Sequence, residues 1–344
     1  MRTARLKLPF PGLFHCINRT VNREFLFEDK EKEHFIWLMR RVEAFTGCTV
    51  ITFVVMGNHF HILLAENESE VLDDEALLAR MEALYGADNT TFKEDKAKLL
   101  KFRADDSHAA AEALRQRYLR RMNNCSEFMR TLNQRFAQWI NKTQERTGHL
   151  WQQRYKRVLV EPGSEALSAM ACYIDMNPVR AGIVDDPKKY PWSGYGQAVA
   201  GVHTARQGFV RLYNADSRLA LGSGPGGATC WEDVAQRYRM LIYETGVQKD
   251  DGYGNTLRPG FSAKEIQDVL ASGGRLSFGQ LMRCRVSYFS SCVVLGSFKF
   301  VADLEPNFRK AMGLKFERKP GEIEEADIGF HVFRRRSGKV RACD

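Results

Sequence analysis

Hydrophobic and polar positions in the first sixty-five residues follow two different periods. Residues 13–19 (LFHCINR) alternate as in a β-strand, and residues 29–45 place apolar side chains at helical spacing. A β-branched run at 48–56 is followed by a Gly-Asn pair, which is a strong hairpin signal, and then by HFHILLA at 59–65. The pattern predicts a strand, a helix, a strand, a tight turn and a strand in succession.

The next part of the chain returns to this plan after an interruption. Residues 66–117 are acidic, rich in Ala and Leu and free of β-branched runs, so we predict a charged helical insertion. A helix over 126–147, a basic strand over 154–161 and a helix over 164–176 follow. The order predicts an α+β fold of the ferredoxin-like, split βαβ kind, an RRM-like antiparallel sheet with helices on one face. The other face would be free to bind a ligand.

The texture of the sequence divides the chain into three parts. Residues 1–200 would form one domain, interrupted by the insertion. Residues 201–260 are polar and Gly-rich, and we predict a linker or irregular region there, with GSGPGGATC (222–230) as its clearest part. Residues 261–344 would be a C-terminal accessory region, with a helix signal in SAKEIQDVLAS (262–272).

Composition indicates a globular protein. The hydrophobic fraction is 44%, and no run of about 18 apolar residues or signal-peptide core is present. We therefore expect a soluble, cytoplasmic protein with no membrane partner. The eight cysteines form no CxxC pair, which favours reduced thiols over a zinc site or a disulfide framework.

Positive charge is concentrated in one block. The net charge is +9, and residues 118–157 carry nine Lys or Arg against two Glu, interleaved with aromatic residues. This composition is typical of a surface that follows phosphates and stacks bases, although a solvated helix face with aromatic core residues has the same composition. The predicted DNA contacts are Arg120, Arg121, Arg130, Arg135, Arg154, Lys156 and Arg157.

Two short patterns carry candidate chemistry. His59 and His61 lie on a predicted strand, so both imidazoles point to one face and can converge on a divalent ion. Tyr173 and Asn177 are four residues apart on a predicted helix and share a face. An amide oxygen suits Mg²⁺ or Mn²⁺, and a phenol beside such an ion could attack a phosphate. Satisfied histidines and a core tyrosine are the alternatives to this interpretation.

Four blocks of the chain resemble REP-associated tyrosine transposases, single-tyrosine HUH enzymes related to bacterial insertion-sequence transposases. The blocks are FHCINRTVNREFLF (14–27), VVMGNHFHILLA (54–65), GHLWQQRYKRVLVE (148–161) and CYIDMNPVRAGIVDDPKKYPWSGY (172–195). They occur in the family's order and span about residues 8–200, apart from the insertion. RCRVSYFSSCVVLGSFKFV (283–301) resembles a C-terminal segment of longer members more weakly.

The resemblance implies a role for each candidate residue. His59, His61 and Asn177 would bind Mg²⁺ or Mn²⁺, and Tyr173 would be the nucleophile. The reaction would leave a 5′-phosphotyrosine and a free 3′-hydroxyl on single-stranded or hairpin-forming DNA, in transposition or in mobilisation of repeats by a domesticated enzyme. The insertion, WSGY in place of WSSY and about 140 residues after Gly201 depart from the family's compact pattern. The oligomeric state stays open, with a homodimer possible.

Two other functions compete with this one. In a non-catalytic RRM-like nucleic-acid-binding protein, His59, Phe60 and Tyr155 would only stack on bases. In a metal-dependent hydrolase, an activated water would cleave the strand without a covalent step. Tyr155, in the basic strand, is an alternative nucleophile, but no metal-ligand partner lies at a useful spacing from it.

Overall fold

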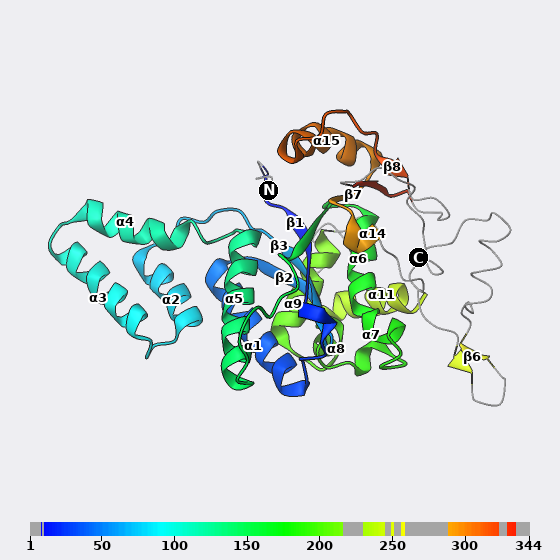
Figure 1. Ribbon diagram of the computed structural model, residues 1–344, viewed down its shortest axis with the longest axis horizontal. Coiled ribbons are helices and arrows are strands. Elements are labelled where there is room, and N and C mark those ends of the chain that lie inside the picture. Colours follow the sequence, from blue (N-terminus) through cyan, green and yellow to red (C-terminus); the bar gives the residue numbers. More distant parts are fainter. Residues whose placement is uncertain are drawn as a thin grey trace.

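A mixed α+β fold is built around one mostly antiparallel sheet (Figure 1). The computed structural model describes residues 8, 10–215, 230–244, 249–250, 256–258, 288–322 and 329–334. Within them the sheet has seven strands in the order β2-β3-β1-β4-β7-β9-β8. The strands are β1 (Leu13–Arg19), β2 (Thr49–Val55), β3 (His59–Ala65), β4 (Lys156–Val160), β7 (Val294–Gly296), β8 (Gly321–Glu322) and β9 (His331–Phe333). All neighbours are antiparallel except β4 and β7.

Two long helices cover one face of the sheet. They are α1 (Asp29–Thr46) and α5 (Cys125–Thr143), which pack against each other and against a core that includes Phe14, Phe60 and Ile62. A capping box between Glu28 and Glu31 begins α1, which satisfies backbone N–H groups that have no partner inside the helix. This face therefore holds the first of two hydrophobic cores.

A second helical layer covers the opposite face. It contains α6 (Glu165–Asp175), α7 (Asn177–Arg180), α8 (Gly194–Val199), α9 (His203–Asn214) and α11 (Trp231–Glu244). The prediction that helices lie on one face only is wrong. The strands carry apolar side chains on this face as well, including Leu13, Ile51, Leu63 and Val158, and burying them requires a second layer.

The insertion forms a helical arm that extends away from the sheet (Figure 1). It consists of α2 (Asp74–Tyr85), α3 (Thr90–Ala104) and α4 (His108–Leu119), so the segment is helical as expected. Only α2 packs closely on α1, while α3 and α4 pack along the arm. Inside the arm, the buried Asp95 carboxylate accepts hydrogen bonds from Tyr118 and Arg117, so its charge is paired.

The region predicted as a linker contributes to the core. Phe209 of α9 and Tyr238 of α11 are fully buried, so the expectation of a linker over 201–260 fails for 203–214 and 231–244. The Gly-rich texture misleads because Gly208 serves close packing, with an added Cβ lying 2.3 Å from the Ile51 carbonyl oxygen. Residues 222–229 and the predicted helix at 262–272 lie outside the described residues.

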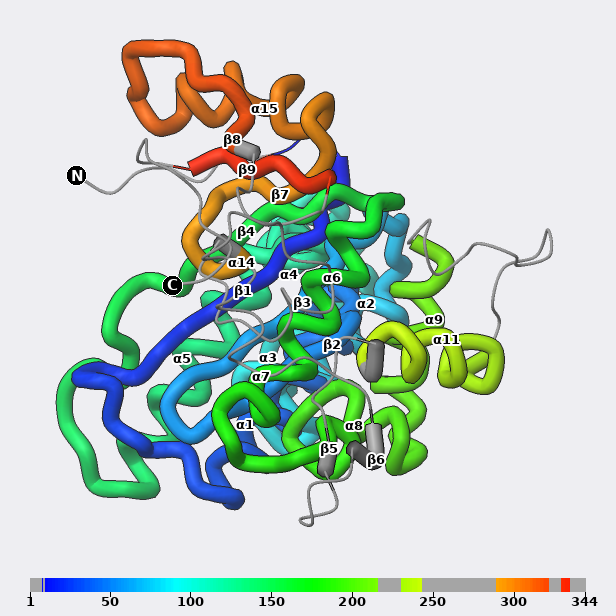
Figure 2. The backbone as a smooth tube through the Cα atoms, turned by 90° about the vertical axis from the view of Figure 1, so that its right-hand side faces the viewer, coloured from blue at the N-terminus to red at the C-terminus, as the bar shows by residue number. Residues whose placement is uncertain are grey.

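The described C-terminal segments extend the same sheet rather than forming a separate layer. Figure 2 shows the orange and red segments beside β4, where β7 pairs with β4, and β9 and β8 follow. Two helices accompany them, α14 (Tyr288–Ser291) and α15 (Phe298–Met312), and β5 (Lys249–Asp250) pairs with β6 (Thr256–Arg258). Short 3₁₀ turns lie at Val21–Arg23 and Pro187–Lys189. Across the described residues, no helix combines the length and apolar character needed to cross a bilayer.

Candidate active site between the sheet and helix α6

A cavity of about 950 Å³ opens between β3 and the α6–α7 segment. His59 and His61 line it from β3, and Tyr173, Asn177 and Arg180 line it from the helices. The rest of the wall includes Asn18, Arg19, Gln152, Arg154 and Lys156. Side chains separated by more than a hundred residues in sequence therefore share one space.

The two histidines reach the cavity because β3 alternates. Phe60, between them, points to the other face, where it is fully buried and its ring lies 4.6 Å from that of Phe35. The His59 and His61 ring centroids are 5.2 Å apart, and both imidazoles face α6. The predicted common orientation of the pair is present in the structure.

Tyr173 and Asn177 lie across the cavity from the histidines. The Tyr173 ring centroid is 5.9 Å from that of His61, and the side chain is 6% exposed. Asn177 follows the end of α6, and its amide nitrogen donates to the carbonyl oxygens of Tyr173 (3.0 Å) and Ile174 (3.2 Å). The nitrogen is thereby held on the helix, which leaves the amide oxygen as the ligand atom that this side chain offers.

A chain of hydrogen bonds fixes the orientation of His61. His15 Nδ1 lies 2.8 Å from the Phe289 carbonyl oxygen, and His15 Nε2 lies 2.8 Å from His61 Nδ1. A carbonyl only accepts, so His15 carries its proton on Nδ1 and, when neutral, accepts at Nε2. His61 then donates from Nδ1, and its Nε2 keeps a free lone pair of the kind that binds metals.

His59 is oriented by its neighbour in the chain. Its Nδ1 lies 2.7 Å from Asn58 Oδ1, and Asn58 Nδ2 donates to the Arg23 carbonyl oxygen at 2.9 Å. The amide oxygen therefore accepts a hydrogen bond from Nδ1–H, so Nε2 carries the lone pair of the neutral His59 ring. Asn58, which in the sequence indicates only a turn, also positions a candidate ligand.

Burial controls the charge of the groups around the cavity. It lowers the pKa of His15 to about 4, against the opposing bond to the Phe289 carbonyl. Burial, followed by the neighbouring His15, His59 and Arg180, lowers the pKa of His61 well below its usual value. Both rings are therefore neutral near pH 7, as metal ligands must be.

Arg180 places a cation beside the tyrosine. Its guanidinium carbon lies 4.4 Å from the Tyr173 ring centroid, and its Nη2 donates to the Tyr173 carbonyl oxygen. Burial lowers the pKa of Arg180 to about 10, so the side chain stays charged at neutral pH. Arg180 was not among the residues predicted from the sequence, although it follows Asn177 by three residues and so occupies the next position on the same helical face.

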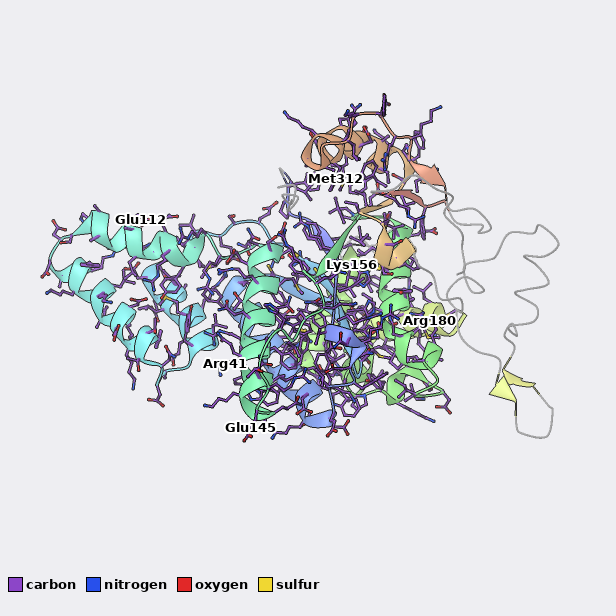
Figure 3. All side chains as sticks on the ribbon, viewed as in Figure 1. Arg41, Glu112, Glu145, Lys156, Arg180 and Met312 are labelled. Atoms are coloured by element: carbon purple, nitrogen blue, oxygen red, sulfur yellow. The ribbon has the colours of Figure 1, made fainter. Side chains whose placement is uncertain are left out.

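The structure separates the predicted DNA contacts into two groups. Arg154 and Lys156 line the cavity, and Figure 3 shows Lys156 and Arg180 on the same side of α5. Arg157, next along β4, points to the other face, and its guanidinium lies 4.7 Å from the Phe14 ring. Arg120 is exposed at the end of α4, outside the cavity lining. Arg121, Arg130 and Arg135 line a different groove, outside α1 and α5.

Tyr155 does not reach the cavity. Its ring is 7% exposed in the core shared with α1 and α5, and its hydroxyl lies 3.5 Å from Ser126 Oγ. Because β4 alternates, Lys156 points into the cavity while Tyr155 points away from it. The alternative nucleophile is therefore separated from the histidines by the sheet.

Metal-ligand chemistry at this site would depend on imidazole and amide groups. In the described part of the chain, no group of three or more His, Cys, Asp or Glu side chains is placed to hold a metal ion. Asp175 is near in sequence, but it is fully buried and accepts hydrogen bonds from Tyr238 (2.6 Å) and Thr52 (2.8 Å). The available donors are Nε2 of His59, Nε2 of His61 and the Asn177 amide oxygen.

Comparisons with known proteins give a distant structural likeness. No family model and no curated protein matches the chain. Among solved structures, the chain is similar to one described as a REP-associated tyrosine transposase bound to a REP hairpin. The two are 14% identical, the alignment covers 58% of this chain and 87% of that chain, and the TM-score is 0.38. A likeness at that level carries no argument about the site.

Proposed function

We propose that this chain is a metal-dependent endonuclease and strand transferase for single-stranded, hairpin-forming DNA, with Tyr173 as its nucleophile. The observation that carries the proposal is the single cavity shared by His59, His61, Tyr173 and Asn177. The strand order β2-β3-β1-β4, with α1 and α5 on one face, supports a ferredoxin-like split βαβ core to which α6 adds a second layer.

The donor set fits Mg²⁺ or Mn²⁺. Nε2 of His59, Nε2 of His61 and the Asn177 amide oxygen would hold the ion, because each side chain has its other polar atom engaged in a hydrogen bond. Three protein ligands leave positions open for oxygen atoms of a phosphate, and a bound cation would stabilise the negative charge that develops on them.

Tyr173 performs the covalent step in this proposal. Its hydroxyl oxygen attacks the scissile phosphorus and forms a P–O bond, while the bond from phosphorus to the 3′ oxygen breaks. The 3′ oxygen leaves with a proton as a free hydroxyl, and the phenol proton passes to water in the cavity. The downstream strand stays attached through its 5′ phosphate, so the reverse reaction rejoins strands without a nucleotide cofactor.

Positive side chains around the cavity suit a polyanionic substrate. Arg180 lies beside the Tyr173 ring, and Arg154 and Lys156 line the opposite wall. Cations at these positions attract the backbone phosphates that flank the attacked bond. A single strand is favoured because the tyrosine is only 6% exposed, and a flexible backbone can enter the cavity to meet it.

The non-catalytic alternative lacks its stacking surface. An RRM-like reader would need Phe60 and Tyr155 on the open face of the sheet, but both are buried under α1 and α5. Only the histidines would remain to contact bases. A hydrolase that activates water needs no tyrosine, so the experiment must ask whether protein and DNA become covalently joined.

The test uses one hairpin oligonucleotide with a single-stranded flank, labelled at either end and incubated with Mn²⁺. The 3′-labelled strand should give a protein-sized band that survives denaturing electrophoresis, and the 5′-labelled strand should give only a shorter free fragment. Tyr173→Phe should abolish both products and retain DNA binding. Tyr155→Phe removes a hydroxyl outside the cavity and should cleave normally. Cleavage by Tyr173→Phe at the normal rate would refute the proposal.

A further inference from the structure

A second basic and aromatic groove lies where the helical arm meets α1 and α5. Its volume is about 630 Å³, and its lining includes His34 and Trp37 from α1, Tyr85 from α2, and Arg135 and Trp139 from α5. Arg121, from the turn between α4 and α5, completes it. The groove shares no lining residue with the cavity at Tyr173.

Arg121 and Arg135 line this groove, and Arg41 lies beside it over the Trp37 ring. None of the three has a carboxylate partner among the described residues. The buried Nε atoms of Arg41 and Arg121 have no hydrogen-bond acceptor among the described residues. Arg121 Nη1 donates to the Tyr85 hydroxyl at 2.7 Å, and the Arg135 guanidinium lies 4.9 Å from the same ring. Burial and then the charges of Arg121 and Arg41 lower the pKa of Arg135. Partly buried cations that lie close together without a carboxylate favour the binding of an anion.

An aromatic platform lies next to these cations. The His34 and Trp139 rings stack at 3.8 Å with an interplanar angle of 10°, and Trp37 lies 5.1 Å from His34. Trp37 is 51% exposed, and the Arg41 guanidinium lies 4.6 Å from its ring centroid. Flat, exposed rings beside positive charges are the features that bind a base together with its phosphate.

The groove and the active-site cavity are on different sides of the fold. Figure 3 shows Arg41 on the arm side of α5, and Lys156 and Arg180 on the other side. The cavity lies between the sheet and α6, whereas the groove lies outside α1 and α5. A strand held at the groove would therefore be a different stretch of nucleic acid from the one at Tyr173.

We propose that this groove is a second binding site for single-stranded nucleic acid, with phosphates at Arg121 and Arg135 and a base stacked on Trp37. The helical arm takes part through Tyr85, whose hydroxyl accepts from Arg121. The site gives the insertion a role in holding substrate. The choice of DNA as the polymer rests on the proposed function, whereas the site itself rests on the groove.

The experiment measures binding of a fluorescent oligo-dT strand by anisotropy, in chelator so that no cleavage occurs. Arg121→Gln with Arg135→Gln should weaken binding at least tenfold and reduce the slope of log K against log salt by about 1.4, at about 0.7 per lost contact. Trp37→Ala should weaken binding roughly tenfold through loss of stacking. The matched control, Lys30→Gln with Lys142→Gln, removes the same charge from exposed positions on α1 and α5 outside the groove and should stay within about twofold.

Two results would overturn the site. Equal losses in the arginine pair and the lysine pair would mean that binding follows net charge alone. Normal binding by Trp37→Ala would show that no base stacks on Trp37. This variant tests the site even where an arginine variant fails to fold, because Trp37 is half-exposed. Covalent joining at Tyr173 is scored separately with saturating hairpin. If the protein joins DNA at Tyr173 but the groove variants bind oligo-dT normally, only the second site is refuted. If the groove variants lose oligo-dT binding but the protein does not join DNA, only the proposed function is refuted.

Discussion

His15 is expected to control metal affinity although it would not touch the ion. Its Nε2 accepts a hydrogen bond from His61 Nδ1–H and so sets the tautomer of His61, and its Nδ1 donates to the Phe289 carbonyl, each at 2.8 Å. Two substitutions separate these bonds. In His15→Asn the amide nitrogen takes nearly the place of Nδ1, and the bond to Phe289 is kept. In His15→Gln the longer amide reaches the place of Nε2, so an acceptor for His61 is kept.

The two variants should differ in metal binding and not in stability. Each loses one buried hydrogen bond, at a cost of about 1–3 kcal/mol in the free energy of unfolding. Only His15→Asn leaves His61 Nδ1 without its acceptor, and the loss of such an orienting partner typically weakens metal affinity by about 10- to 100-fold, or about 1.4–2.7 kcal/mol. We expect His15→Gln to bind Mn²⁺ within about threefold of the unchanged protein.

The assay is a titration of metal-free protein with Mn²⁺, followed by the paramagnetic resonance signal of the free ion, with a thermal melt of each variant. If both variants bind Mn²⁺ as the unchanged protein does, His15 does not orient His61. Equal loss in both would mean that the buried site tolerates no change at this position and that metal affinity does not depend on the tautomer of His61. Only a difference between the variants supports the orienting role of His15.

Three further outcomes follow from the site and its surroundings. His59→Ala or His61→Ala should abolish Mn²⁺-dependent cleavage in the labelled-hairpin assay while Asn177→Ala does less, because water can replace one amide oxygen; full-rate cleavage in excess chelator would contradict this assignment. Burial raises the pKa of Asp175 to about 7 from an unfolded value near 3.8, so its contribution to stability is complete below about pH 4 and is lost as pH rises through 7. Relative to Asp175→Asn, the unfolding free energy from urea titration should fall by up to about 4 kcal/mol over that window, and parallel pH profiles would refute it. Gly208→Ala places a Cβ 2.3 Å and 2.7 Å from two carbonyl oxygens of β2, so it should destabilise by about 1–3 kcal/mol despite a better helix former, and an unchanged urea midpoint would show that α9 can shift.

Much of the candidate site could be predicted from short-range patterns in the sequence. The alternation of β3 was enough to place His59 and His61 on one face, and helical spacing was enough to pair Tyr173 with Asn177. These inferences need only the local period of each element. That α6 packs over β3 and brings the two pairs together depends on long-range burial of apolar side chains on the second face, which a local pattern cannot specify.

The basic block shows where a count along the sequence fails. Its members lie on a helix and on a strand that belong to different layers. Arg135 projects outward from α5, whereas Lys156 projects from β4 into the cavity, so charges close in sequence face different spaces. The sum of charge over forty residues therefore does not reveal that these charges line two separate surfaces.

The groups that orient His61 could not be predicted from the sequence for a different reason. His15 lies in β1 among apolar neighbours, and its contact with His61 depends on the register that sets Ile17 opposite His61. The acceptor that completes the chain is a backbone carbonyl, that of Phe289, which any residue type would supply. Phe289 lies in α14, which immediately precedes β7, the strand that pairs with β4 in parallel. Because β7 adds to the edge of the sheet beside β1's own partner, the C-terminal region is part of the site's support, and a chain cut near residue 200 would leave His15 free to adopt either tautomer.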